Sequence, residues 1–397
     1  MTENMERGSG SRSPHPVYRD TNLQIVFGVT LMAVLGVSSI TPAFPKIVKE
    51  LGISPQAVGS LITVFTLPGV LLTAVLGILA DHFGRRKILV PALMIFALAG
   101  GACAFARDFN LLLALRFFQG VGAAGLGAMN VTIIGDLYSG KERSAAMGCN
   151  SSVLSVGTAS YPAIGGALAT LAWYYPFILP LAAIPVGLAV LFSLHNPEPK
   201  NVQDFRQYLR TTGQIIASRR VVGLFAISTI TFIILYGSYL TYFPLFIEDS
   251  FAVSPLIIGL IMSVSSVATA VTSAQLGRLA KLSSERTLIT AGCILYAVSL
   301  VTIPFVSNIW LLLIPTVVFG VAQGINIPSL MALLADLAPM EQRGALMSIN
   351  GMVLRLGQTL GPLIMGAVFV VWGTGGAMYA GAGFALAMLM VVLAGLR

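Results

Sequence analysis

The chain has 397 residues, of which 56% are hydrophobic and only 10% are charged, and its formal net charge is +8. A soluble fold of this length has too little interior to hide so much apolar surface, so the composition excludes a water-soluble globular protein. A basic excess is also typical of nucleic-acid-binding proteins, and the positions of the basic residues distinguish that explanation from membrane orientation.

Apolar runs of membrane-spanning length recur along the chain after a polar beginning. A hydrocarbon core about 30 Å thick calls for about 20 apolar residues per spanning helix. The turns between the runs are short, so no sizeable soluble domain is expected. We predict spanning helices at residues 22–44, 57–79, 88–106, 110–135, 145–170, 176–194, 221–245, 255–276, 287–305, 309–335, 345–368 and 374–396.

Two polar segments set the predicted domain boundaries. Residues 1–20 are rich in Gly, Ser and Arg and predict a disordered cytoplasmic tail, and the first apolar run has no cleavage site after it, so we expect no cleavable signal peptide. Residues 195–220 form the longest polar stretch, and their basic, partly amphipathic pattern predicts a linker along the cytoplasmic membrane surface. Six-helix bundles are then expected at 21–194 and 221–397.

The 23 basic residues divide unevenly between the two sides of such a bundle. Lys46, Lys49 and Arg107 lie on one side and two arginines lie within spans, so 18 (23 minus 5) lie on the side of both termini. Membrane proteins keep Lys and Arg on the cytoplasmic side. We therefore predict a multi-pass protein of the inner (plasma) membrane with both termini in the cytoplasm, and no nucleic-acid partner.

The remaining chemistry-bearing residues indicate neither catalysis nor a cofactor. Cys103, Cys149 and Cys293 lie in or beside apolar runs, where a thiol acts as a small hydrophobe, so we expect no disulfide and no metal site. All three histidines lie in the tail or in loops, and the glycine-rich segments lie inside spans without a Walker lysine. The sequence predicts a protein that is not an enzyme.

A shift of 200 residues superposes many residues of the two halves. One register that holds over several helices indicates an internal duplication. The predicted fold is therefore an all-α membrane protein of twelve transmembrane helices in two pseudo-symmetric six-helix bundles, with a binding site near the midplane between them. The superposed pairs include Asp136 with Asp336, Arg143 with Arg343, Asn150 with Asn350, Pro162 with Pro362 and Gly166 with Gly366.

The loop after the second predicted helix reads Gly77-Ile-Leu-Ala-Asp81-His-Phe-Gly84-Arg85-Arg86-Lys87. Gly77 allows close helix approach, Gly84 permits a tight turn, and the Asp81 carboxylate is placed to accept hydrogen bonds. The segment resembles the signature G-x-x-x-D-x-x-G-R-[RK] of the major facilitator superfamily. The resemblance implies a loop that latches the cytoplasmic gate in the outward-facing state. A merely basic loop explains the arginines but not the glycines or Asp81.

A second charge pattern accompanies this loop. Asp136 ends the fourth predicted helix seven residues before Arg143, and Asp336 stands in the same relation to Arg343. The symmetric spacing predicts paired cytoplasmic charges that support gating. A purely structural role is the alternative.

The fourth predicted helix contains Arg116, Gln119, Gly120 and Gly122, in a run that resembles the family's R-x-x-Q-G-x-G-A-A signature. An arginine two turns inside a span is costly unless it faces a cavity or a partner, so Arg116 is a candidate for coupling or substrate binding. The alternative is a side chain that snorkels to the outer interface. Gln119 is expected on the same polar face.

The fifth predicted helix combines glycines with Pro162. This pattern resembles the G-x8-G-x-x-x-G-P-x-x-G-G signature of the family's antiporters and of its 12-helix drug:proton exporters, and it implies a helix that bends during alternating access. Tyr161 replaces the glycine before the proline, which weakens that inference, and ordinary small-residue packing is the alternative. The predicted helix-bend residues are Gly148, Gly157, Pro162, Gly165 and Gly166.

The eleventh predicted helix carries Arg355 about eleven residues from either end, too deep to snorkel. We expect it to face the cavity with a substrate or gating role, and structural pairing is the alternative. Gln323, Asn326 and Gln358 are further candidates for the cavity lining, each of which also suits helix-to-helix hydrogen bonding.

The residues and the resemblance together predict a secondary transporter that exports small amphipathic or anionic molecules by alternating access, as a monomer among membrane lipids. All 15 acidic residues fall in tails, loops or helix ends, so proton coupling is expected to run indirectly through Asp136 or Asp81. A lipid or lipid-linked-sugar flippase and a non-transporting membrane sensor on the same fold are the alternatives.

Overall fold

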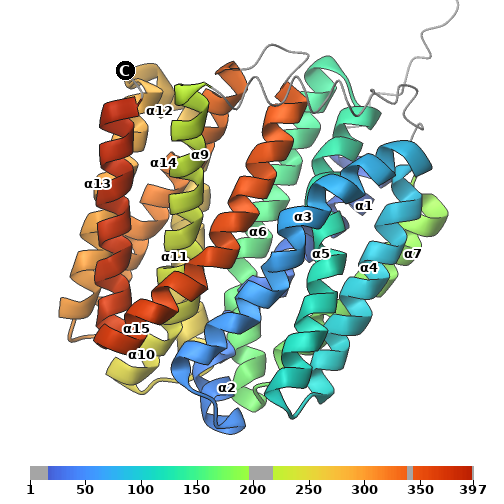
Figure 1. Cartoon of the computed structure of the whole chain (residues 1–397). Coiled ribbons are helices and arrows are strands. Elements are labelled where there is room, and N and C mark those ends of the chain that lie inside the picture. Colours follow the sequence, from blue (N-terminus) through green and yellow to red (C-terminus); the bar gives the residue numbers. More distant parts are fainter. Residues whose placement is uncertain (1–16, 196–217, 338–342, 396–397) are drawn as a thin grey trace, which may run out of the picture.

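The computed structural model describes residues 17–195, 218–337 and 343–395. Most of the predicted tail (1–20) and of the predicted linker (195–220) lies outside the described residues. Helices account for nearly all of the described chain, and no strand occurs in these ranges. Figure 1 shows the long helices running side by side between two faces of the molecule.

The N-terminal half contains six membrane crossings, several of them assembled from more than one helical segment. The segments are η1 (Val17–Arg19), α1 (Thr21–Ser38), η2 (Thr41–Ala43), α2 (Phe44–Leu51), η3 (Pro55–Gly59), α3 (Ser60–Phe83), α4 (Arg85–Ala102), η4 (Cys103–Phe105), α5 (Phe109–Leu137), α6 (Gly140–Leu171), η5 (Tyr175–Ala182) and α7 (Ala183–Ser193).

The C-terminal half repeats this plan and includes one π-helical segment, η6. Its segments are α9 (Arg219–Ile233), η6 (Ile234–Tyr242), α10 (Phe243–Phe251), α11 (Pro255–Ala274), α12 (Leu276–Leu282), α13 (Glu285–Thr302), η7 (Ile303–Phe305), α14 (Leu313–Leu337) and α15 (Arg343–Gly395). α15 is two helices joined at Gly373, whose φ of 67° and ψ of −165° are not helical.

The predicted twelve-helix fold is confirmed, although several crossings are longer than predicted. Ten stretches of the described chain are long and apolar enough to span, the last of which, Ile349–Ala394, contains both helices of α15. These stretches account for eleven crossings, and the less apolar α6, the fifth along the chain, brings the number to twelve. The first crossing continues to Leu51 and the seventh to Phe251, because α2 and α10 extend them with charged residues that end the apolar pattern.

The long helices of the bundle run between two opposite faces (Figure 1). The terminal face is the one at which α1 begins and α15 ends, and the distal face is the one at which α2 and α10 end. In Figure 1 the C-terminus and α12 lie at the upper end, whereas α2 and α10 lie at the lower end. The duplication is visible at the distal face, where Gly52 and Ala252, 200 residues apart, both end their helices with positive φ (61° and 50°).

At the distal face, α6 of one half packs backbone to backbone against α11 of the other. A Cβ added at Gly166 would lie 2.3 Å from the Pro255 carbonyl oxygen, and one added at Gly259 would lie 2.1 Å from that of Pro162. No side chain fits at such distances. Only glycine permits this crossing, and lipid supplies no hydrophobic force to replace the packing.

A second crossing joins α3 to α15 near the same face. The Thr63 hydroxyl donates to the Thr359 carbonyl oxygen at 3.2 Å, and the Thr66 and Thr359 hydroxyls lie 2.9 Å apart. A Cβ added at Gly59 would lie 3.2 Å from Pro362. At the rim, Lys49 of α2 forms an ion pair with Glu248 of α10. The two halves are therefore closed together at the distal face.

The same helix pairs are unpacked toward the terminal face. Gly77 of α3 and Gly351 of α15 have no atom within 4 Å of an added Cβ, and neither do Gly148 of α6 and Gly277 of α12, the short helix that follows α11. Each pair thus makes close contact near one end and leaves its glycines uncovered near the other.

We expect Gly166→Ala to weaken the distal closure, because its methyl group would force α6 away from the α11 backbone. Overpacking of this kind costs about 1–3 kcal/mol, so the thermal unfolding temperature of the purified protein should fall. Gly383→Ala is the matched control, since Gly383 is an α15 glycine with nothing within 4 Å. An equal effect of the two substitutions on the unfolding temperature would contradict the close contact.

Candidate functional site

The terminal face of the N-terminal half carries a compact charge cluster. Arg85, only 7% exposed, donates from Nε to Asp136 Oδ2 at 2.5 Å and forms an ion pair from Nη2 to Asp81 Oδ1 at 2.8 Å. Gly84, with φ of 97°, makes the turn that brings Arg85 back over the end of α3. The structure therefore brings together Asp81, Arg85 and Asp136 of the predicted gating set.

The other predicted gating residues lie around this cluster. Arg86 and Arg143 are exposed, and the Arg143 guanidinium packs over Gly135, where an added Cβ would lie 3.3 Å from Nη2. Gly77 makes no close helix contact in this conformation. The charge cluster is formed within one half, at the face where the two halves are unpacked.

The predicted helix-bend residues lie along α6, which remains one continuous helix through Pro162. Gly157 faces Leu31 of α1, and a Cβ added at Gly165 would lie 1.8 Å from the Ser39 carbonyl oxygen. Tyr161, the departure from the antiporter pattern, is 9% exposed and packs beside Gly157. The distal part of the motif is packing in this state, whereas Gly148 at its other end is uncovered.

Arg116 is fully buried inside the N-terminal half. Its guanidinium donates to the carbonyl oxygens of Leu61 (3.1 Å) and Gly36 (2.9 Å) and to Gln119 Oε1 (2.7 Å). Its Cζ atom also lies 4.2 Å from the centre of the Phe65 ring. This arrangement joins α5 to α1 and α3, and it leaves no face of Arg116 open between the halves. The side chain does not snorkel.

Arg355 has a different environment. It is partly exposed, and among the described residues its hydrogen-bond partner is Gln358 Oε1, at 3.1 Å from Nη1. The side chain crosses to the other half, where a Cβ added at Gly69 of α3 would lie 3.1 Å from Cδ and one added at Gly127 of α5 would lie 3.0 Å from Nη2. It also interacts electrostatically with Tyr236 of η6.

The remaining predicted polar residues lie elsewhere in the C-terminal half. Asn326 is fully buried, and its Nδ2 donates to Thr231 at 3.3 Å. Gln323 lies 3.5 Å from the Thr269 hydroxyl. The predicted coupling or substrate set is therefore divided among three places, and Arg355, to which Gln358 is bonded, is the member whose side chain contacts the other half.

Two buried hydrogen-bonded groups were not selected from the sequence. Thr30 donates to Asn150 Oδ1 at 2.7 Å and accepts from Asn130 at 3.1 Å, which joins α1, α5 and α6. In the second half Ser228 donates to Asn350 Oδ1 at 3.0 Å. The repeat of Asn150 as Asn350 was the signal, because a polar residue retained in both halves of a duplication has a buried partner to satisfy.

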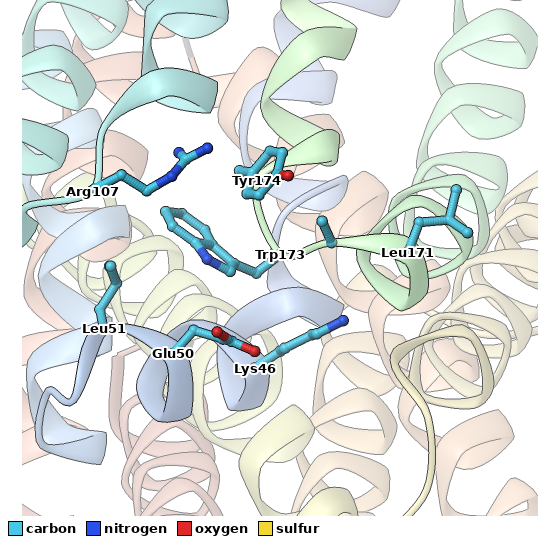
Figure 2. A pocket seen from close by; sticks show the side chains of 8 residues that line it. Lys46, Glu50, Leu51, Arg107, Leu171, Trp173 and Tyr174 are labelled. Atoms are coloured by element: carbon cyan, nitrogen blue, oxygen red, sulfur yellow. The ribbon is translucent and has the colours of Figure 1, made fainter.

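The distal face has a separate hollow within the N-terminal half, with a volume of about 360 Å³. Figure 2 shows the Arg107 guanidinium beside Tyr174 and above Trp173, with Glu50 and Lys46 on the opposite wall. Arg107 donates to the carbonyl oxygens at the end of η4, and Lys46 donates to those at the end of α6. Both cations thus stabilise helix ends, and this hollow is remote from Arg355.

Comparison with known proteins gives consistent matches over almost the whole chain. A family model described as Major Facilitator Superfamily matches residues 26–250 and 225–397. The bacillibactin exporter of Bacillus subtilis (strain 168) is 27% identical over 362 residues, which cover 87% of this chain and 89% of that protein. The class C tetracycline resistance protein of Escherichia coli is 26% identical over 376 residues, covering 90% and 94%. The crystal structure of the nucleoside transporter NupG superposes with a TM-score of 0.80 at 14% identity, covering 95% of this chain and 100% of that one, and so shows the shared fold.

The two arginines should respond differently to substitution. Arg116→Gln removes charged hydrogen bonds to two backbone carbonyl oxygens, each worth about 1.5–3 kcal/mol, so we expect the thermal unfolding temperature to fall by several degrees. Arg355→Gln, which removes one side-chain bond at a partly exposed site, should lower it much less. The reverse order of the two unfolding temperatures would show that Arg116 does not hold the N-terminal half together.

Proposed function

Because the chain belongs to the Major Facilitator Superfamily, we propose that it exports small amphipathic or anionic molecules by alternating access. The family and the transporter relatives make it a multi-pass transporter of the plasma membrane and not an enzyme. Relatives named for bacillibactin export and for multidrug and tetracycline resistance support outward transport and a small-molecule substrate. We take the monomer as the transporting unit.

The contrast between the two ends of the same helix pairs carries the alternating-access proposal. The pairs α3–α15 and α6–α11 are packed near the distal face. Toward the terminal face the glycines of α3, α15, α6 and α12, the helix that follows α11, are uncovered. Interfaces between packed helices are bistable. Glycines that contact no neighbouring helix in one conformation would pack against the facing helix in the other. Closure at the terminal face would bring Gly77 toward α15 and Gly148 toward α11.

The distribution of basic residues supports placing the terminal face in the cytoplasm. The conformation described is then closed to the outside and open to the cytoplasm, the state in which an exporter loads its substrate. In this state the Asp81–Arg85–Asp136 cluster is satisfied within its own half. The latch proposed for this loop engages the other half only after the terminal face closes.

Proton coupling is proposed to run through the same cluster. Asp81 and Asp136 both form ion pairs with Arg85. Protonation of one carboxylate would weaken its own ion pair and leave Arg85 bonded to the other carboxylate. The protonated side chain would then be released at the rim of the gate. This supports indirect coupling, because the carboxylates lie at the terminal face and not beside Arg355.

Cysteine cross-linking tests alternating access at both faces of the protein. We start from a variant in which Cys103, Cys149 and Cys293 are replaced by serine. Into it we introduce either Thr66→Cys with Thr359→Cys near the distal face, where the two hydroxyl oxygens lie 2.9 Å apart, or Gly148→Cys with Gly277→Cys at the terminal face. The distal pair should form a disulfide in the resting protein. The terminal pair should do so only in a population shifted away from the described state.

The decisive measurement combines the two pairs with transport. Oxidation of the distal pair should stop export from vesicles, a reductant should restore it, and single-cysteine variants should be unaffected. In the four-cysteine variant, a closed distal disulfide should prevent the terminal one. Full export activity with the distal disulfide closed would refute alternating access through this interface.

A further inference from the structure

Two charges of the described chain stand in the middle of spanning helices, and only one of them is available to a ligand. Arg116 is fully buried and bonded to three acceptors inside its own half. Arg355 is partly exposed, and its Nε and Nη2 groups have no acceptor among the described residues. A guanidinium has five N–H donors and remains charged at any physiological pH. Arg355 therefore requires further acceptors that the described protein does not supply.

The position of Arg355 along α15 places it at the inner end of the unpacked region. Thr359, one helical turn nearer the distal face, joins α15 to α3, because its carbonyl oxygen accepts from Thr63 and its hydroxyl lies 2.9 Å from that of Thr66. The Thr359 hydroxyl donates to the Arg355 carbonyl oxygen at 2.9 Å. Gly351, one turn in the other direction, is uncovered. A molecule that enters from the terminal face meets the Arg355 charge just before the closure.

The surroundings of Arg355 combine one positive charge with an aromatic wall. Phe232 and Tyr236 are stacked, with ring centres 6.0 Å apart and an interplanar angle of 29°, and both are partly exposed. Tyr236 lies in the π-helical segment η6, a feature that is frequent at functional sites. Gln358 accepts one Arg355 N–H and orients the guanidinium, which leaves the planar donors for a bidentate acceptor.

We propose that the guanidinium of Arg355 binds the acidic group of the transported molecule, a carboxylate or sulfonate attached to a planar aromatic body that packs on Phe232 and Tyr236. This inference deepens the proposed function. The transport of the bound molecule rests on the proposed function, whereas its binding at Arg355 does not. It assigns the two arginines different roles, with Arg116 holding the N-terminal half together and Arg355 recognising the ligand.

The contact of Arg355 with the other half makes this binding sensitive to conformation. Its aliphatic part lies against Gly69 and its Nη2 against Gly127, where the absence of side chains leaves room for it. The guanidinium is therefore positioned by contact with both halves, and it loses that position when the halves rotate apart. A larger residue at Gly127 should therefore displace the guanidinium without removing its charge.

The test compares two ligands of the same shape. We would measure the affinity of the purified protein for 2-naphthoate and for the uncharged 2-naphthamide by equilibrium titration in detergent. The parent should bind the anion about tenfold or more tightly than the amide, as expected for charged hydrogen bonds. In Arg355→Gln the two affinities should become equal within about twofold, and Arg355→Lys should retain part of the preference because a lysine keeps the charge without the planar fork.

Two further variants separate recognition from folding. Gly127→Val should reduce the preference for the anion while the arginine is still present, and Arg107→Gln in the distal hollow should leave it unchanged. Equal affinity of the parent for both ligands, or a preference that survives Arg355→Gln, would overturn the proposal. If the cross-linked pairs remain mutually exclusive in that case, alternating access stands and only the anion site fails. Loss of exclusivity with an intact anion preference would instead refute alternating access and leave the anion site standing.

Discussion

Direct contact between helix backbones holds the two halves of this transporter together. At the crossing of α6 and α11, glycines on both helices meet carbonyl oxygens at distances that admit no side chain. In a lipid bilayer apolar side chains gain little by leaving their surroundings, so association depends on close packing and on polar groups. The distal crossing and the threonine contacts between α3 and α15 supply both. The location of this contact determines which face is open, and hence which polar groups a solute can reach.

Buried polar groups then differ in where their hydrogen-bond partners lie. Thr30, Asn130 and Asn150 bond to one another, and Arg116 bonds to backbone oxygens and to Gln119. Such groups stabilise one bundle, because an unpaired polar group in hydrocarbon is costly. Arg355 lies between bundles with most of its donors unpaired, which is tolerable only where solvent or a ligand completes them. Because Arg116 Nη2 and Gln119 Nε2 also have no partner among the described residues, an unpaired donor alone does not mark a site. The position of Arg355 between the halves marks the candidate site.

The sequence was sufficient for the helices, the duplication and the family, because hydropathy, spacing and the Gly77–Arg86 signature each depend on local pattern. It could not place α2 and α10, whose charges end the apolar runs although the helices continue. Nor could it separate Arg116 from Arg355. Both are arginines deep in a span, and the difference lies in partners such as Leu61 and Gly69, which are distant in sequence. The conformation of the gate was equally out of reach, since Gly148 and Gly166 belong to one motif but only one is packed.

In the proposed cycle, the unpaired charge of Arg355 would also make transport responsive to voltage. In the described state the guanidinium lies on the terminal side of the closure and experiences the potential of that side, and closure at the other end would transfer it to the opposite potential. An empty carrier thus moves up to one charge through the membrane field, worth up to about 2.3 kcal/mol per 100 mV. A carrier loaded with a monovalent anion moves none at this site. In the proposed orientation, with the terminal face in the cytoplasm, the negative interior of the cell would draw the empty site inward and so reset the proposed exporter for its next load.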